Sequence, residues 1–484
     1  MLTERLSRMV PHRPLRGHAI RGARWLTWLA VILLVTAGSI AVALAVTPLQ
    51  TVGVAGQDLR VGATMPDLSL SGPGEIDLFG QSLPTTQQFT GPVRPKVQLS
   101  QITINSELTT FVQGSKPAGA TRLLGSRLAA GWLHYFTWET VIAGACALVG
   151  VGALAGWRRL PPRTTIKLVV AGLVVTEAIN VGAIMITTYR APAVLQQVHS
   201  LNELVGNTPV NARARPAGPA LPGVQAVVLG DSTAAGAGLA QVSRGTWSDA
   251  ACGRSPDSYA SDLAAANDWH VLNASCDSAT ISEGLLGSQF RSGRHLPPQI
   301  DVAQRAPHAT VVIVSVGADD LNWSTMVVYC AVAPRCDDRA TTAYFQQQLA
   351  QFSKDYLQLL SQLATLPGHP TVIVNRYYDP FGPTAACLTK AGLTDVKLRT
   401  LNSRLATLNA VLAKGAQQFG FASPQPDFAG HQLCSAQPYV QGLTAPAPFH
   451  PTALGQLAIA LTDQAVLRTA TGPSSAGGVR AQGG

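Results

Sequence analysis

The chain has 484 residues, only 13% of them are charged, and the net charge is +9. This length exceeds that of one ordinary domain, and the scarcity of charges, together with a mean hydropathy of +0.19, is typical of a protein with membrane segments. The basic residues flank apolar segments instead of forming one patch, so the composition argues against a nucleic-acid partner.

Three apolar segments are predicted to be transmembrane helices. The first, residues 25–46, is longer than the roughly 20 residues that span a bilayer core of about 30 Å, and it follows a basic N-terminus at residues 1–24. The second segment covers residues 139–156 and the third covers residues 168–188. Four aromatic residues typical of a membrane interface precede the second segment: Trp132, Tyr135, Phe136 and Trp138. A cleaved signal peptide is the alternative for the first segment, although the apolar part of a signal peptide has only about 7–15 residues.

The orientation of these segments is predicted from the basic residues, because these concentrate in cytoplasmic loops. Residues 1–24 and the loop 157–167 are therefore expected on the cytoplasmic side. This loop carries four basic residues: Arg158, Arg159, Arg163 and Lys167. Residues 48–137 are then expected outside as a small β-rich segment, followed after the third span by a proline-containing linker at 189–223. Residues 469–484 are expected to be a disordered tail, so the chain is predicted to sit in the cytoplasmic membrane with its C-terminal half outside.

Six of the seven cysteines lie after residue 250, in the part of the chain that is expected outside. An even set of cysteines in such a compartment indicates disulfides, although the sequence alone does not choose among the pairings. A metal site is the alternative, and it is disfavoured because only Cys330 and Cys336 are close together and no His-x-x-x-His motif accompanies them. The seventh cysteine, Cys146, lies in the second apolar segment and is interpreted as a small apolar residue.

Residues 224–468 alternate short apolar runs with longer helical patterns. The runs are predicted strands, and they cover residues 224–229, 270–273, 309–316, 371–375 and 420–422. The helical patterns cover residues 255–265, 340–366, 395–418 and 452–469. This alternation predicts an α/β domain in which helices cover both faces of a parallel sheet. Because ligands of such sheets bind beyond the carboxyl ends of the strands, the residues that follow each strand are the candidates for a functional site.

Two connections between strands and helices carry residues with catalytic potential. Ser232 follows the first strand within Gly230-Asp231-Ser232, where glycine permits a tight turn that exposes the serine hydroxyl at the start of a helix. His450 stands just before the last helix and could act as the base for this serine. Each residue alone also fits an ordinary structural role, the serine as a helix N-cap and the histidine as a structural residue.

Six sequence blocks follow one another between residues 227 and 455. They begin with Val227-Val228-Leu229-Gly230-Asp231-Ser232 and end with Phe449-His450-Pro451, and the others lie at residues 252–259, 273–280, 314–320 and 428–434. Together they resemble the SGNH (GDSL-type) hydrolases, and among them the secreted bacterial esterases and lipases with three disulfides. The resemblance covers residues 224–468 and implies a flavodoxin-like, three-layer α/β/α domain. It also implies pairing of successive cysteines: Cys252–Cys276, Cys330–Cys336 and Cys387–Cys434.

The resemblance implies a mechanism as well. Ser232 would be the nucleophile, and His450 would be the general base that accepts its proton. The oxyanion of the tetrahedral intermediate would bind the backbone amide of Ser232, the backbone amide of Ser278 and the side chain of Asp319. The family chemistry implies neither a metal nor another cofactor.

Three positions depart from the family pattern. The acid that usually lies three residues before the histidine is replaced by Ala447, whose backbone carbonyl could hold the Nδ1 proton, so a Ser232–His450 dyad is expected. Ser278 replaces a glycine, and its amide can donate provided that the backbone does not need a positive φ. Asp319 replaces an asparagine. An ionised carboxylate there would repel the oxyanion, whereas a buried, protonated one could donate to it.

These observations predict a membrane-anchored, extracytoplasmic carboxylic-ester hydrolase that works through an acyl-serine intermediate. Its expected partners are the membrane and an ester substrate, such as a cell-envelope lipid or an acylated glycan. Two alternatives stay open: an acyltransferase or deacylase that modifies an envelope glycan or lipid, and a non-catalytic SGNH-like binding module, which Asp319 would favour. The acyl chain, the alcohol and the oligomeric state are not predicted.

Overall fold

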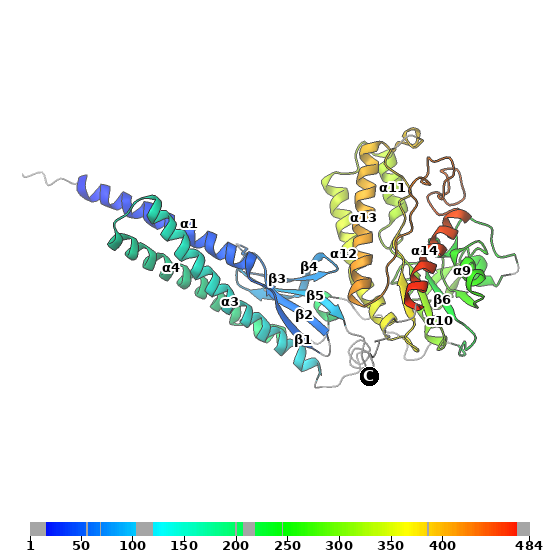
Figure 1. Cartoon of the computed structure of the whole chain (residues 1–484), viewed down its shortest axis with the longest axis horizontal. Helices are drawn as coiled ribbons and strands as arrows, with labels where there is room; N and C mark the ends of the chain where they lie inside the picture. Colours follow the sequence, from blue (N-terminus) through cyan, green and yellow to red (C-terminus); the bar gives the residue numbers. More distant parts are fainter. Residues whose placement is uncertain are drawn as a thin grey trace, which may run out of the picture.

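The structure, a computed structural model, combines a three-helix rod, a five-stranded sheet and an α/β domain (Figure 1). It describes residues 16–54, 57–67, 69–102, 120–198, 201–206, 218–243, 245–384 and 387–471. Parts of four predicted segments lie outside the described residues, namely the basic N-terminus up to residue 15, residues 103–119 of the β-rich segment, residues 199–200 and 207–217 of the linker, and the tail from residue 472.

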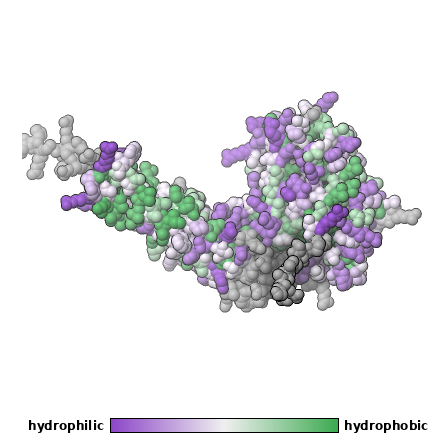
Figure 2. Space-filling model, viewed as in Figure 1, coloured by the Kyte–Doolittle hydropathy of each residue, from purple (hydrophilic) through white to green (hydrophobic). Residues whose placement is uncertain are grey.

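The rod consists of three long apolar helices that pack side by side (Figure 1). These are α1 (Arg16–Val46), α3 (Ala120–Trp157) and α4 (Pro162–Thr188). Three segments are long and apolar enough to cross a membrane, namely Thr27–Val46 in α1, Gly125–Trp157 in α3 and Pro162–Gln196, which begins with α4 and runs past its end. Polar side chains within the rod bond to one another, because Asn180 Nδ2 donates to Glu139 Oε2 at 2.8 Å and the Thr36 and Thr176 hydroxyls lie 2.9 Å apart. Figure 2 shows apolar side chains along the outer surface of the rod and hydrophilic ones at its far end.

The second helix, α3, extends well beyond the predicted apolar segment at its N-terminal end. This first part of α3 packs against a sheet of order β1-β2-β5-β3-β4, in which only the β3–β5 pair is parallel. The strands are β1 (Gln50–Val54), β2 (Gln57–Ala63), β3 (Ser71–Leu78), β4 (Gln81–Thr90) and β5 (Pro95–Ile102). Leu128, Trp132 and Tyr135 are buried on α3, and the Tyr135 hydroxyl donates to the Leu44 carbonyl of α1 at 3.0 Å.

The same sheet contacts the α/β domain, so that it lies between this domain and the rod (Figure 1). The rings of Phe79 and Tyr356 meet edge to face with their centroids 5.4 Å apart. Gln418, the last residue of helix α13 (Asp395–Gln418), donates from Nε2 to the Leu99 carbonyl at 2.9 Å. Both contacts involve helices of the α/β domain.

The α/β domain is built on four parallel strands in the order β11-β10-β6-β7. They are β6 (Ala226–Gly230), β7 (Val271–Asn273), β10 (Val311–Ser315) and β11 (Thr371–Val374). Four of the five predicted strands are thereby confirmed. The fifth, at residues 420–422, is reduced to one isolated bridge between Ala422 and Ile373. Every residue of β6 and β10 is buried, which explains their unbroken apolar sequences.

Helices cover both faces of this sheet, as predicted (Figure 1). α12 (Arg339–Ala364) and α13 lie on one face, whereas α9 (Tyr259–Asn267) and α14 (Ala453–Thr471) pack together on the other. The remaining elements are α5 (Ala191–Gln196), α6 (Leu201–Val205), α7 (Ser232–Ala235), α8 (Trp247–Ala251), β8 (Gln289–Arg291), β9 (Arg294–Leu296), α10 (Ile300–Arg305), α11 (Trp323–Val332) and the 3₁₀ turn η1 (Thr389–Ala391).

The six cysteines of the α/β domain form the three expected pairs. Disulfides join Cys252 to Cys276, Cys330 to Cys336 and Cys387 to Cys434. Cys146 is free and lies within α3. Two of the disulfides flank the elements that carry the site, since Cys276 lies two residues before Ser278 and Cys330 is on α11, which borders the pocket.

Candidate active site

Ser232 stands where β6 ends and α7 begins, at the carboxyl edge of the sheet. The turn requires glycine at position 230, because φ there is +151° and a Cβ atom would lie 2.2 Å from the Ser315 carbonyl oxygen of β10. The buried side chain of Asp231 accepts a hydrogen bond from the Thr233 amide at 2.9 Å and so caps α7. These contacts fix the backbone on both sides of the serine.

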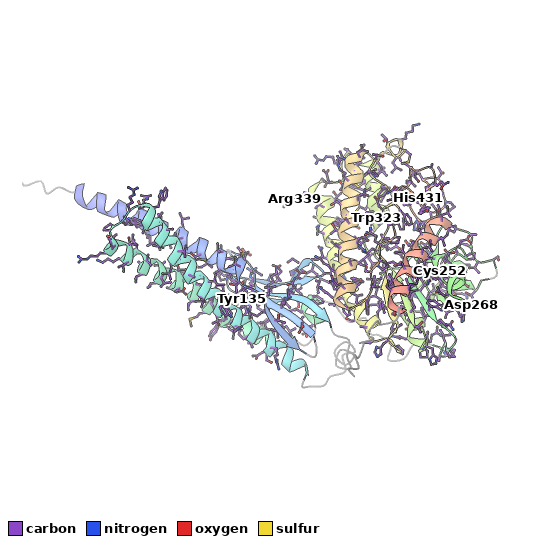
Figure 3. All side chains as sticks on the ribbon, in the orientation of Figure 1. Tyr135, Cys252, Asp268, Trp323, Arg339 and His431 are labelled. Atoms are coloured by element: carbon purple, nitrogen blue, oxygen red, sulfur yellow. A yellow bond between two sulfur atoms is a disulfide. The ribbon has the colours of Figure 1, made fainter. Side chains whose placement is uncertain are left out.

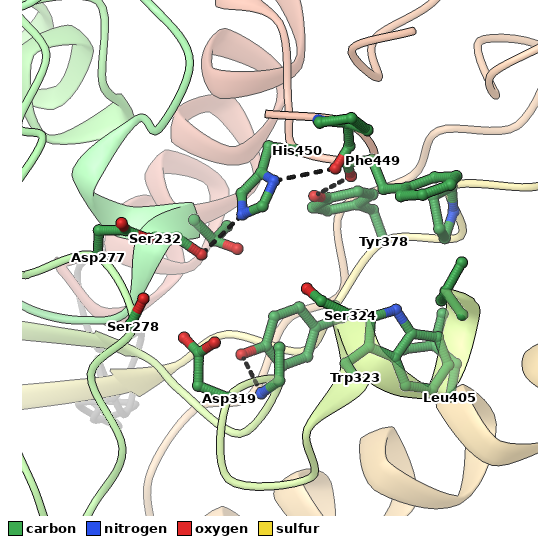
Figure 4. A pocket seen from close by; sticks show the side chains of 16 residues that line it. Ser232, Asp277, Ser278, Asp319, Trp323, Ser324, Tyr378, Leu405, Phe449 and His450 are labelled. Atoms are coloured by element: carbon green, nitrogen blue, oxygen red, sulfur yellow. Dashed lines mark hydrogen bonds between the residues drawn. The ribbon is translucent and has the colours of Figure 1, made fainter. Parts of the chain in front are cut away.

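His450 lies against this serine. Its Nε2 atom is 2.7 Å from Ser232 Oγ, and its Nδ1 atom is 3.1 Å from the Pro448 carbonyl oxygen (Figure 4). When Nδ1 carries the proton and donates it to Pro448, Nε2 is left free to accept the serine proton. Burial lowers the pKa of His450, although the Pro448 carbonyl and the negative charge of Asp277 oppose that shift. The ring is therefore neutral at neutral pH, as a general base must be.

The carbonyl that holds the imidazole is not the expected one. Ala447 was predicted to bind the Nδ1 proton, but its carbonyl instead accepts the backbone N–H of His450 at 3.3 Å. The turn formed by this bond presents the next carbonyl, that of Pro448, to the ring. Ala447 still lies close enough to contribute to the pKa of His450 as a weaker backbone acceptor.

Ser278 has a backbone φ of +59°, which is the left-handed conformation that glycine adopts easily. The position therefore does have the positive φ that would count against a serine, but Ser278 adopts this conformation, so its backbone amide stays a candidate donor. Serine keeps this conformation at a cost of about 1–2 kcal/mol. The side chain nevertheless lines the same pocket as Ser232.

Asp319 follows β10 and also lines this pocket. Its Oδ2 atom is shielded from solvent and has no hydrogen-bond partner among the described residues. Burial, followed by the negative charges of Asp231 and Asp277, raises the pKa of Asp319 to about 8. At neutral pH the carboxyl group is therefore protonated, and it carries an O–H that can donate to an oxyanion.

Tyr377 is a functional residue that the sequence reasoning missed. Its hydroxyl donates to Asp231 Oδ2 at 2.5 Å and accepts the Ala318 amide at 2.9 Å, so it ties the serine turn to the loop that carries Asp319. Tyr377 and the neighbouring Tyr378 both line the pocket. Their place just beyond the carboxyl end of β11 was the available signal, because this is the edge at which ligands of parallel sheets bind.

The pocket encloses about 150 Å³ and brings together four of the predicted site residues (Figure 4). Ser232, Ser278, Asp319 and His450 form its polar side, and Ala447 is not part of the lining. Trp323 and Val327 of α11 and Leu405 of α13 form its apolar side. Figure 3 places Trp323 among the side chains of the α/β domain. Among the described residues, no group of three His, Cys, Asp or Glu side chains is placed to hold a metal ion.

The part of the chain that carries this arrangement is similar in sequence to known proteins. Residues 228–458 match the GDSL-like Lipase/Acylhydrolase family. A lipase from Streptomyces rimosus is 29% identical over 259 residues, which are 51% of this chain and 87% of that lipase. Lipase 1 from Streptomyces coelicolor is 30% identical over 157 residues, which are 30% of this chain and 56% of that lipase. Among solved structures, the extracellular lipase from Streptomyces rimosus matches 51% of this chain with all of its own, at 24% identity and a TM-score of 0.39.

Proposed function

Because the α/β domain belongs to the GDSL-like lipase/acylhydrolase family and the chain is thus an ester hydrolase, we propose that Ser232 and His450 form its catalytic dyad. One observation carries the proposal, namely the 2.7 Å contact between Ser232 Oγ and His450 Nε2 inside a pocket. The ester is that of a cell-envelope lipid or of an acylated glycan. The domain acts outside the cytoplasmic membrane and is held there by the three-helix rod.

The reaction proceeds through an acyl-enzyme. Ser232 Oγ attacks the ester carbonyl carbon while its proton passes to His450 Nε2. The Pro448 carbonyl keeps the ring in the required tautomer, although it cannot neutralise the imidazolium as a carboxylate would. His450 then gives the proton to the leaving alcohol. A water molecule attacks the acyl group in the same way and releases the acid, with His450 again accepting and returning the proton.

The oxyanion that forms in each step requires donors. We assign this role to the backbone amides of Ser232 and Ser278 and to the protonated carboxyl group of Asp319. The orphaned, buried Oδ2 atom of Asp319 supports the assignment, because a donor reserved for a reaction intermediate has no partner in the resting enzyme. The non-catalytic alternative depended on an ionised Asp319, and the raised pKa of this buried carboxyl weighs against it.

The pocket favours a short acyl group. Its volume of about 150 Å³ is comparable to that of an apolar cavity able to hold a benzene-sized molecule. Trp323, Val327 and Leu405 offer the apolar surface for this group opposite the dyad. Longer chains would have to extend past these side chains into solvent.

Labelling with a fluorophosphonate tests the dyad. The reagent should bond covalently to Ser232 Oγ with loss of fluoride, and Ser232→Ala should not be labelled, because no other serine contacts His450 Nε2 among the described residues. Ser353→Ala is the matched control, since it removes a buried serine hydroxyl on α12 that donates to the Leu349 carbonyl and does not line the pocket. Labelling of Ser232→Ala as fast as the wild type would remove the basis of the catalytic assignment. Mass spectrometry of the labelled peptide identifies the serine.

Reporter fusions test the proposed topology. A reporter that is active only outside the membrane should work when fused after residue 190 and fail when placed between Arg158 and Lys167. The reason is that the four basic residues of this loop hold it on the cytoplasmic side. A cytoplasmic reporter should give the opposite pattern at the two sites. If both reporters reverse, the α/β domain is cytoplasmic and the proposed location is wrong.

A further inference from the structure

The segment that carries His450 lies directly against the loop that follows Ser232. Gly238 shows how closely they approach, because a Cβ atom there would lie 2.3 Å from Gln441 Oε1 and 2.6 Å from the Ala447 Cβ. Ala237 is joined to the nucleophile by a hydrogen bond of 3.0 Å from its amide to the Ser232 carbonyl. Any residue that connects Ala237 to the histidine segment therefore connects the two halves of the dyad.

Gln441 makes this connection. Its buried Nε2 atom donates to the Ala237 carbonyl at 2.7 Å and to the Pro451 carbonyl at 2.9 Å. Its backbone N–H donates to the His450 carbonyl at 2.7 Å, and its own carbonyl accepts the Phe449 amide at 3.1 Å. One residue thus holds the backbone on both sides of His450 and fastens it to the loop of Ser232.

The histidine depends on such support for two reasons. Its ring lacks the carboxylate that would otherwise fix it, and on the Nδ1 side it hydrogen-bonds to the Pro448 carbonyl at 3.1 Å. The residue before it, Phe449, has a φ of +69°, a conformation that a bulky side chain avoids unless its surroundings impose it. The Tyr378 hydroxyl holds the Phe449 carbonyl at 2.9 Å, and Gln441 holds the amide of the same residue.

We propose that Gln441 is a positioning residue, which sets the distance between Ser232 Oγ and His450 Nε2 by joining the two segments through the double hydrogen bond of its side-chain amide. Gln441 does not line the pocket, so it acts through His450 and not on the substrate. The inference rests on the proposed Ser232–His450 dyad. In other members of the family an acid orients the histidine by binding its ring. Here the neutral side-chain amide of Gln441 would orient the histidine by binding the backbone around it.

Gln441→Leu tests the proposal, because leucine keeps the approximate size of the side chain and removes both donors. We expect kcat for a short-chain aryl ester and the rate of fluorophosphonate labelling to fall together by roughly 10- to 100-fold, since misplacement of a reacting group by about 1 Å costs up to 100-fold. KM should change by less than about 3-fold. Gln362→Leu, a loss of a buried glutamine on α12 that touches neither segment, is the matched control and should keep the wild-type rates.

A second variant separates positioning from a loss of folding. In Gln441→Glu the protonated acid can donate one hydrogen bond, whereas the ionised form donates none and faces two carbonyl oxygens. Its labelling rate, divided by that of the wild type at the same pH, should therefore rise as the pH is lowered from 8 to 5. If Gln441→Leu does not fold, this ratio carries the test, and a ratio that stays constant across the pH range overturns the proposal.

Four further results would refute the positioning role of Gln441. A wild-type labelling rate in Gln441→Leu, or in Gln441→Glu at pH 8, overturns the proposal, as does an equal loss in Gln362→Leu or a change confined to KM. Ser232→Ala measured in parallel keeps the two hypotheses apart. If Ser232→Ala is labelled like the wild type, the dyad itself is wrong, whereas Ser232-dependent labelling with unimpaired Gln441 variants refutes only the positioning role.

Discussion

Alanine at position 450 is expected to lower kcat for a short-chain aryl ester by roughly 10⁴- to 10⁶-fold. His450 Nε2 hydrogen-bonds to Ser232 Oγ, so the loss of this side chain leaves the hydroxyl without its base. In the wild type, burial lowers the pKa of His450 below 6.5, so kcat/KM should rise with pH through a value under 6.5 as the ring becomes neutral. Steady-state kinetics from pH 4.5 to 9 measure both effects.

His295→Ala is the control for this experiment. His295 is exposed on β9, where its ring lies 5.0 Å from that of Phe290 and away from the pocket lining, so its removal should leave kcat within about 3-fold. A His450→Ala enzyme that keeps more than a tenth of the wild-type kcat would contradict the role of His450 as the base.

Asparagine at position 319 is expected to change the alkaline side of the pH profile. The pKa of Asp319 is raised to about 8, first by burial and then by nearby carboxylates. Under the proposed mechanism the carboxyl group is protonated below this pH and donates to the oxyanion, whereas above it the group is ionised and repels the oxyanion. Wild-type kcat should therefore fall as the pH rises through about 8. Asp319→Asn should lack this decline, since an amide donates at every pH, and should exceed the wild type by up to about 100- to 1,000-fold well above the transition.

The position of the transition distinguishes three outcomes. Nearly equal rates of the two enzymes at pH 6, with divergence above pH 8, agree with a protonated donor. A large gain in Asp319→Asn already at pH 6 would mean that the wild-type carboxylate is ionised and inhibitory there. A loss at every pH would mean that the carboxylate has a positive role and that the donor assignment is wrong. Asp262→Asn, a half-buried carboxyl on α9 outside the pocket, should keep the wild-type profile.

Much of the α/β fold could be predicted because its elements have simple sequence signatures. Strands β6 and β10 are buried along their whole length and therefore consist of continuous apolar residues. Helix α13 begins at Asp395 and ends at Gln418, the two residues predicted, since its buried leucines recur at helical spacing along one face. The strand predicted at 420–422 does not form, because only Ala422 pairs with the sheet, at Ile373. A run of three apolar residues does not reveal how many of them will pair.

The sequence predicted which residues form the site but not which atoms they bond to. Positions 232, 278, 319 and 450 follow from the strand ends and from the order of the sequence blocks, and the structure brings them into one pocket. The choice between the Ala447 and Pro448 carbonyls depends on backbone angles near Phe449, which no residue pattern encodes. The bond between Tyr377 and Asp231 joins residues 146 positions apart, so it becomes visible only once the sheet has been assembled.

The length of α3 has a consequence for where the enzyme works. Its 38 residues make a rod of about 57 Å, of which a bilayer core needs only about 30 Å. The remainder extends beyond the bilayer core and packs against β1 and β2 of the five-stranded sheet, and Phe79, in the turn between β3 and β4, contacts Tyr356 of the catalytic domain. Under the proposed topology the pocket therefore lies at a fixed distance from the lipid and in a fixed orientation. The enzyme would meet its substrate by lateral diffusion in the membrane. Membrane-anchored esters at this distance from the lipid would encounter the dyad often. Esters deeper in the bilayer or farther out in the wall would not reach it.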